Sequence, residues 1–261
     1  MEERKKPKAW LSVASVAVFL LIWYLCTAVL RLVPAKTLPD PVKVLQTFLG
    51  KFVNRNPDGA TLLQHTLSSL QVALTGYGVA LLVGIPLGIL MAWNRRTDRF
   101  VRPIFDLIKP IPGVAWIPLT IVILGIGIES KAAVVFFSAV VPCVLNAYTG
   151  VKQTKEVHLW VARTFGGTRR QMLFRIAIPT ALPYIMTGVR IALGSAWVAI
   201  VAAELLGSTR GLGFMIQQAR GIFRSDIILV GMIAIGICGA ILTAVLTFVE
   251  KKIVKGKERH G

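Results

Sequence analysis

Six long, uncharged and apolar stretches occupy most of this 261-residue chain. A bilayer core of about 30 Å takes roughly 20 helical residues, so each stretch is long enough to cross a membrane. The stretches are 9–30, 67–94, 110–128, 132–151, 176–203, which only Arg190 interrupts, and 227–249. They predict an all-α integral membrane protein, one domain over residues 1–261. The expected transmembrane helices are 9–32, 66–94, 104–128, 132–151, 176–205 and 227–250.

The chain is strongly basic, with 30 Lys and Arg against 12 Asp and Glu and a formal net charge of +18. In a soluble protein this charge would suggest nucleic acid as a partner. Here the basic residues lie between apolar stretches, so we expect a lipid bilayer and no nucleic acid. With the N-terminus inside, 20 basic residues fall on the cytoplasmic side and nine outside. Because cytoplasmic loops are rich in Lys and Arg, both termini are predicted to be cytoplasmic.

The connections between the apolar stretches differ in length. In the outer loop, Leu38-Pro-Asp-Pro-Val42 predicts a turn that leads into a short amphipathic helix over 42–53. Only Glu129-Ser-Lys131 separates the third stretch from the fourth, which predicts a tight hairpin at the outer side. The largest cytoplasmic connection, 152–175, mixes apolar and basic residues, and we expect one or two short helices there.

Signatures of catalysis and of cofactor binding are missing from the sequence. There is no phosphate-binding G-x-x-x-x-G-K-[ST] loop, and His65, His158 and His260 lie in three separate segments. The three cysteines lie inside apolar stretches without metal-binding spacing. We therefore expect no enzyme activity, no metal and no cofactor on this chain, so any energy from ATP has to come through another subunit.

A more specific pattern lies in the cytoplasmic connection. Ala162 and Gly166, four residues apart, are expected on one helix face, where small residues let a partner's backbone approach closely. Arg163 can reach acidic groups on that partner, and Phe165 adds an apolar contact. Pro179 is expected where a helix restarts. This pattern indicates a docking element, although a solvated basic loop that only enforces topology has the same composition.

The same segment resembles a known signature. Ala162, Gly166, Ile176 and Pro179 match the E-A-A-x3-G-x9-I-x-L-P pattern of permease subunits of bacterial ABC importers, while Trp160 and Val161 replace its Glu and first Ala. Further blocks are similar to permeases of sulfonate, taurine or nitrate importers. They are Leu38-Pro-Asp-Pro, Pro110-Ile-Pro-Gly-Val-Ala-Trp-Ile-Pro118, Gly125-Ile-Gly-Ile-Glu-Ser-Lys131, and Ala203-Glu-Leu-Leu-Gly207 with Gly211-Leu-Gly213.

This resemblance implies a type I, MetI-like permease fold in a bacterial inner membrane. It also implies a second copy of the permease, two cytoplasmic ATP-binding subunits that carry ATP and Mg, and an external solute-binding protein. Transport would proceed by alternating access. The implied coupling residues are Ala162, Arg163, Thr164, Phe165, Gly166, Gly167, Ile176 and Pro179. Two alternatives from other classes are an ion-coupled secondary transporter acting alone and a membrane-embedded enzyme.

Five residues are candidates for the translocation pathway. Arg190 and Glu204 are charged within the fifth stretch, and intramembrane charges are often functional. Fourteen residues separate them, about 21 Å on a helix, so they cannot pair with each other. Arg190 could attract an anionic solute or bond neighbouring carbonyls, and Glu204 could shape an outer gate or cap the glycine-rich loop that follows. Asn146 could contact the pathway or make an interhelical bond, and Trp116 and Trp197 could line the pathway or anchor the helices at the membrane interface.

Overall fold

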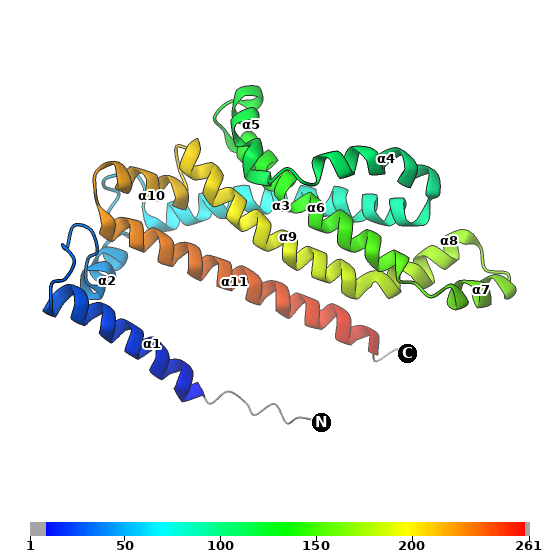
Figure 1. Ribbon diagram of the computed structural model, residues 1–261, viewed down its shortest axis with the longest axis horizontal. Helices are drawn as coiled ribbons and strands as arrows, with labels where there is room; N and C mark the ends of the chain where they lie inside the picture. Colours follow the sequence, from blue (N-terminus) through cyan, green and yellow to red (C-terminus); the bar gives the residue numbers. More distant parts are fainter. Residues whose placement is uncertain (1–8, 259–261) are drawn as a thin grey trace.

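Residues 9–258 of the chain are described by a computed structural model, and they form helices with no β-strand in that part of the chain. The basic N-terminal tail therefore lies outside the described residues. Three long helices form the centre, with α6 packed between α3 and α9 (Figure 1). The helices are α1 (Ala9–Tyr24, extended by a π-helical turn Leu25–Val29), α2 (Pro41–Gly50), α3 (Leu62–Trp93), α4 (Arg95–Ile108), a 3-10 turn Gly113–Trp116, α5 (Ile117–Leu124), α6 (Ile128–Lys152), α7 (Glu156–Thr164), α8 (Arg169–Met172), a π-helical turn Leu173–Ala177, α9 (Ile178–Leu206), α10 (Leu212–Gly221) and α11 (Ser225–Glu258).

Small residues allow the central helices to pack closely. A side chain at Gly84 would collide with Cys143 of α6, and one at Gly88 would collide with the backbone of Val144. The core between α3, α6 and α9 contains Ala80, Ala139 and other small apolar residues that are fully buried. This close contact of small side chains is the usual way in which membrane helices gain packing energy.

Four single helices are long and apolar enough to cross a membrane: Leu62–Trp93, Ile128–Lys152, Arg169–Leu206 and Ser225–Lys252. Val13–Val29 is a shorter apolar helix. Most of the predicted apolar stretches are therefore helical, and the described residues contain four such helices, or five if a bent pair counts as one span. The number of six spans stays a prediction. Large apolar side chains such as Phe19, Leu82 and Val122 face outward, as expected of surfaces that contact lipid or another membrane subunit.

The expected third span, 104–128, is wrong as a single helix. Its residues divide between α4 and the segment Gly113–Leu124, and the two parts are bent by 83° at the break. Pro110 and Pro112 lie at the break, and proline lacks the backbone N–H that a continuing helix would use there. α4 also begins well before residue 104, and its charged side chains make it an amphipathic helix.

The outer loop agrees with its prediction, whereas the hairpin link does not. α2 occupies the expected amphipathic segment, and the Asp40 side chain caps it by accepting a hydrogen bond of 2.9 Å from the Lys43 N–H. The predicted link Glu129-Ser-Lys131 lies inside the first turn of α6 instead. The turn is formed by Gly125–Gly127, where Gly125 has a positive φ of 76°.

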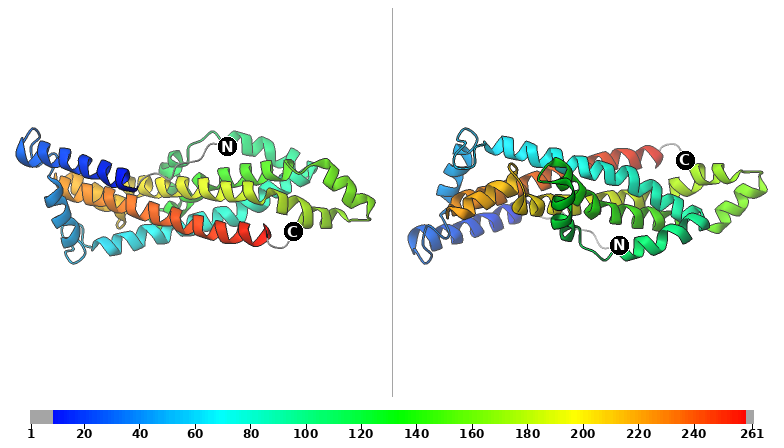
Figure 2. Two further views of the ribbon diagram at one scale, coloured as in Figure 1. Left: turned by 90° about the horizontal axis from the view of Figure 1, so that it is seen from below. Right: turned by 90° about the horizontal axis from the view of Figure 1, so that it is seen from above.

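The elongated molecule has two different ends. Figure 1 and Figure 2 show α7 and α8 at one end, near the junction of α3 and α4. α2, α10 and the loop between α2 and α3 lie at the other end. The two parts of the sequence expected on opposite sides of the membrane are thus held at opposite ends of the central helices.

Candidate functional site

α7 and the turn that follows it carry six of the eight predicted coupling residues, from Ala162 to Gly167. None of the nine residues of α7 is buried, and Trp160 is 60% exposed. Phe165, directly after the helix, is 87% exposed, and Val161 is exposed beside it. Arg163 lies in the last turn, where its charge is favourable beside the negative end of the helix. The result is an apolar and basic surface at the tip of the molecule.

Gly166 has a different role from the one predicted. α7 ends at Thr164, so Ala162 and Gly166 do not share a helix face. Gly166 has a φ of 76°, a left-handed conformation that favours glycine, and its N–H donates to the Arg163 carbonyl at 3.0 Å. The Gly167 N–H donates to the Ala162 carbonyl at 2.8 Å, which completes a helix C-cap. The glycines therefore stop α7 and turn the chain towards α8.

The second half of the predicted coupling segment belongs to the long helix that follows. Thr168 and Gln171 form a capping box at the start of α8. The helix then continues through the turn that contains Ile176 into α9, so that Arg169–Leu206 is one apolar helical span of 38 residues. Pro179 lies in the first turn of α9 but inside this continuous helix, so no helix restarts there. The helix begins at Arg169, ahead of residue 176, and α7 with its capping turn is the separate element. The membrane boundary at residue 175 stays a prediction.

At the opposite end, Glu204 is the centre of a buried polar cluster. Its side chain is 1% exposed, and its two oxygens accept hydrogen bonds from the Ser69 hydroxyl at 2.8 and 2.9 Å. The Gly213 N–H donates to the same carboxylate at 2.9 Å. The Leu212 N–H donates to Ser69 at 2.9 Å. Glu204 thus caps the loop before α10 and joins it to α3, one of the two roles considered from the sequence.

The glycines of this loop are required by close contact with Glu204. Gly211 has a φ of 132°, and a Cβ built on it would lie 2.2 Å from the Glu204 carboxyl carbon. A Cβ on Gly213 would lie 2.6 Å from the Val201 carbonyl. Only glycine lets the backbone come close enough to bond the carboxylate.

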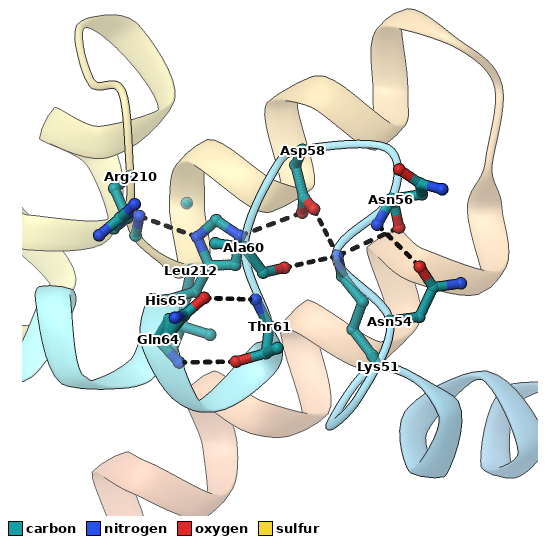
Figure 3. A network of polar contacts seen from close by, with 12 residues as sticks. Lys51, Asn54, Asn56, Asp58, Ala60, Thr61, Gln64, His65, Arg210 and Leu212 are labelled. Carbon is teal, nitrogen blue, oxygen red and sulfur yellow. Dashed lines mark hydrogen bonds and ion pairs between the residues drawn. The ribbon is translucent and has the colours of Figure 1, made fainter.

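The cluster continues through His65 to the outer loop (Figure 3). The Gly211 N–H donates to His65 Nδ1 at 3.1 Å, which leaves the proton of the ring on Nε2. Nε2 lies 3.2 Å from the Asp58 carboxylate. Asp58 pairs in turn with the Lys51 ammonium, which also donates to the Ala60 carbonyl at 3.0 Å. This series of polar contacts, which runs from Lys51 through Asp58 and His65 to Gly211, connects the end of α2, α3 and the loop before α10.

Charge and burial act on Asp58 in opposite directions. Burial raises the pKa of its carboxyl group, whereas the contact with the His65 ring and the hydrogen bond and charge of Lys51 lower it. The net result is a pKa below the ordinary value, so Asp58 is ionised at neutral pH.

Arg190 pairs with Glu250 of α11, and its side chain is half exposed. Glu204 and Arg190 therefore have different partners, which agrees with the prediction that their separation along the helix prevents them from pairing with each other. Asn146 donates to the Pro142 carbonyl at 2.8 Å and packs against Gly188, so it lies at the contact of α6 and α9. The pathway roles of these residues stay predictions.

The two tryptophans also contact helices. Trp197 is buried, and its indole N–H donates to the Ile235 carbonyl of α11 at 3.1 Å. Trp116 is partly exposed and stacks on Phe137, with 4.5 Å between ring centroids. All five pathway candidates thus contact a neighbouring helix or turn, each with different partners.

Ser69, His65, Asp58 and Lys51 were not predicted as members of a site. Each appears unremarkable in the sequence, because the four are spread over 19 residues and their partners Glu204 and Gly211 come much later. The available signal was the polar Gln64, His65, Ser68 and Ser69 at the start of an otherwise apolar helix.

The comparison with protein families decides the identity of the chain. Residues 84–259 match the family described as binding-protein-dependent transport system inner membrane component. The chain belongs to this family. The match begins in α3 and includes the α7 element, Glu204 with the loop before α10, and α11.

Curated relatives of this permease cover nearly its whole length. The taurine transport system permease protein of Escherichia coli is 36% identical over 93% of this chain and 88% of its own. The nitrate import permease protein of Synechocystis is 33% identical over 97% and 92%. The bicarbonate transport system permease protein of Synechococcus elongatus is 32% identical over 94% and 89%.

The fold of the permease is also found in a solved transporter. A chain of the inward-facing MetNI methionine ABC transporter matches with a TM-score of 0.60 at 20% identity. The match covers 75% of this chain and 95% of that chain, which shows a MetI-like fold. The permease is therefore a multi-pass membrane protein and the transmembrane subunit of an ABC importer, and its relatives are transport permeases and not enzymes.

Proposed function

We propose that this permease imports a small oxyanion, delivered by an external solute-binding protein, with energy from two separate cytoplasmic ATPase subunits. The observation that carries the proposal is the exposed apolar surface of α7 and its following turn, the tip of the molecule. There Trp160, Val161 and Phe165 are exposed beside Arg163. Large apolar side chains exposed together at a polar end of a membrane protein favour a protein partner.

The tip fits an ATPase subunit of this family of importers. Gly166 and Gly167 cap the C-terminal end of α7 and connect it by a short turn to the long helix Arg169–Leu206. A movement of the ATPases that shifts α7 would therefore act directly on a helix that spans the membrane. This connection supports alternating access driven by ATP binding, with ATP and Mg on the partner subunits and no cofactor on this chain.

Charge supports a cytoplasmic position for the α7 end. Lys152, Lys155, Arg163, Arg169 and Arg170 gather there, and basic loops favour the cytoplasmic side. We infer that both termini are on this side. The Glu204 cluster then lies at the external end, where the solute-binding protein would dock.

The solute class is inferred from the relatives, whose names give taurine, nitrate and bicarbonate as the transported compounds. All three carry a small oxyanionic group. Two permease copies around one pathway complete the proposed transporter, because this chain alone has its apolar helix faces exposed.

The proposal is tested by purification and reconstitution. The permease is co-expressed with a candidate ATPase and solute-binding protein, purified in mild detergent and placed in proteoliposomes. We expect a complex with two permeases and two ATPases, and uptake of labelled taurine, nitrate or bicarbonate that needs ATP and the binding protein. Uptake by the permease alone, driven by a proton or sodium gradient, would overturn the proposal in favour of a secondary transporter.

A matched pair of variants tests the docking surface. Phe165→Ser removes the most exposed apolar side chain of the tip, and Phe223→Ser does the same at the opposite end, where Phe223 is 83% exposed. We expect Phe165→Ser to lose ATPase co-purification while membrane insertion stays normal. Phe223→Ser should retain the ATPase, and equal retention by both variants would contradict docking at α7.

A further inference from the structure

A cavity of about 630 Å³ with both polar and apolar walls lies near the Glu204 cluster, and Leu67, Ile126 and Ile128 form its apolar part. Its walls come from the outer half of α3, the turn before α6 and the loop between α9 and α10. The polar residues that line it are Gln64, Ser68, Gln71, Lys131, Thr209 and Arg210. A water molecule occupies about 30 Å³ of liquid, so this cavity has room for a small solute with part of its hydration shell.

Lys131 and Arg210 give the cavity its positive charge. Lys131 is 7% exposed, and its ammonium donates a hydrogen bond of 3.0 Å to the Ser208 hydroxyl. Ser208 donates in turn to the Arg210 carbonyl at 2.6 Å, so one serine binds the Lys131 ammonium and the backbone of Arg210.

Backbone and side-chain dipoles add to this field. Gly127 and Ile128 line the cavity at the start of the 25-residue helix α6, whose N-terminal end carries partial positive charge. The amides of Gln64 and Gln71 supply further N–H donors. The opposing group is Glu129, an exposed carboxylate whose Oε2 lies against Gly127.

We propose that this cavity is an anion-binding entrance site for the transported solute, which attracts a sulfonate or similar oxyanion before it passes between the helices. The proposal rests on the proposed function for the solute class. It adds that the permease itself selects for negative charge, through Lys131 and Arg210, independently of the solute-binding protein. Clefts lined by charge of one sign concentrate ions of the opposite sign.

Thiol labelling tests the proposal without transport. Ser68→Cys places a thiol in the cavity wall of a full-length chain in which the three native cysteines are replaced by alanine, within the complex in lipid nanodiscs. The thiol is reacted with a negatively charged methanethiosulfonate that carries a sulfonate group, or with a positively charged one of similar size. The ratio of the two rates cancels any change in the thiolate fraction, because both reagents attack the same thiolate.

We expect the anionic reagent to be favoured, and the double change Lys131→Gln and Arg210→Gln to lower the rate ratio about tenfold. Glu129→Gln should raise the ratio. The control is Arg220→Gln, which removes an exposed arginine of α10 that does not line the cavity. It should leave the rate ratio unchanged. A second control places the thiol away from the cavity, with Thr37→Cys at an exposed position. Its rate ratio should be the same with and without the double change Lys131→Gln and Arg210→Gln.

An unchanged ratio in the double variant, or an equal fall with Arg220→Gln, would overturn the entrance site. The same holds if the Ser68→Cys thiol reacts with neither reagent. These outcomes are separate from failure of the proposed function. If the complex transports no oxyanion but the ratio changes as expected, the solute assignment fails. If oxyanion uptake proceeds and the ratio is unchanged, the entrance site fails.

Discussion

The carboxylate of Glu204 accepts a hydrogen bond of 2.8 Å from the Ser69 hydroxyl, although the two residues are 135 positions apart in the chain. Ser69 also accepts from the Leu212 N–H, and Glu204 accepts from the Gly213 N–H. One carboxylate and one hydroxyl therefore join α3, the end of α9 and the start of α10. This contact holds the ends of two central helices that lie opposite α7, together with the α10 loop, in one arrangement.

Glu204→Ala should destabilise the permease by about 3 kcal/mol, because buried N–H and hydroxyl groups lose their acceptor. Glu204→Gln keeps one oxygen acceptor and the shape of the side chain, so its loss should be smaller. The measurement is the midpoint of thermal unfolding of the purified complex in detergent. If Glu204→Ala unfolds normally yet abolishes uptake, Glu204 acts in the pathway and not in the support of this loop.

Stability should fall at acid pH through Asp58. Because His65 and Lys51 hold its pKa below the ordinary value of 3.8, its contribution is fully present above that value. The contribution is lost as the pH falls through the lower pKa of the folded protein. We expect Asp58→Asn to lower the unfolding midpoint at pH 7 and to flatten the remaining pH dependence below about pH 4. A parallel pH profile in the two proteins would contradict this role.

Lys51→Met should be destabilising by about 3 kcal/mol, since it leaves the buried Asp58 carboxylate without its cation. The double variant with Asp58→Asn should recover part of this loss, because the remaining partner is then uncharged. Thermal unfolding of the two single variants and the double variant measures the coupling. Additive losses would show that the pair does not interact in the folded protein.

Gly166→Ala should weaken ATPase co-purification, because a left-handed backbone costs a residue with a Cβ about 1–2 kcal/mol. Gly166→Asn should be milder, since asparagine tolerates this conformation. The control is Gly50→Ala at the end of α2, a position with open space and without positive φ. If the alanine and asparagine variants both co-purify with the ATPase as well as the wild type does, the cap of α7 is not needed for docking.

Arg190→Gln and Glu250→Gln should have similar, modest effects on stability and uptake, because the two residues pair across α9 and α11. The charge reversal Arg190→Glu with Glu250→Arg should restore most of any loss. Uptake is measured beside the amount of assembled complex. Loss of uptake in Arg190→Gln alone, with normal assembly and a normal Glu250→Gln, would assign Arg190 to the anion pathway instead.

Local patterns in the sequence predicted some elements well. The α2 helix with its Asp40 cap follows from the turn residues before an amphipathic segment. Pro179 was expected where a helix restarts, but it lies inside a helix that is continuous from Arg169. The third span is not a single helix, because apolar content alone predicts a helix of the right length and does not register the break at Pro110 and Pro112. The role of Gly166 was missed for a similar reason, since a spacing of four assumes that the helix continues.

The sequence by itself determined that this chain is an apolar helical membrane protein, which end carries the basic charge, and which segment resembles a coupling element. Those properties depend on composition, on charge between apolar stretches and on short motifs. Only the tertiary structure decided the partners of Glu204, Arg190 and Lys131, because Ser69, Glu250 and Ser208 are distant in the chain. Hydrogen bonds and ion pairs require atoms within a few ångströms, and that proximity arises only when the helices pack.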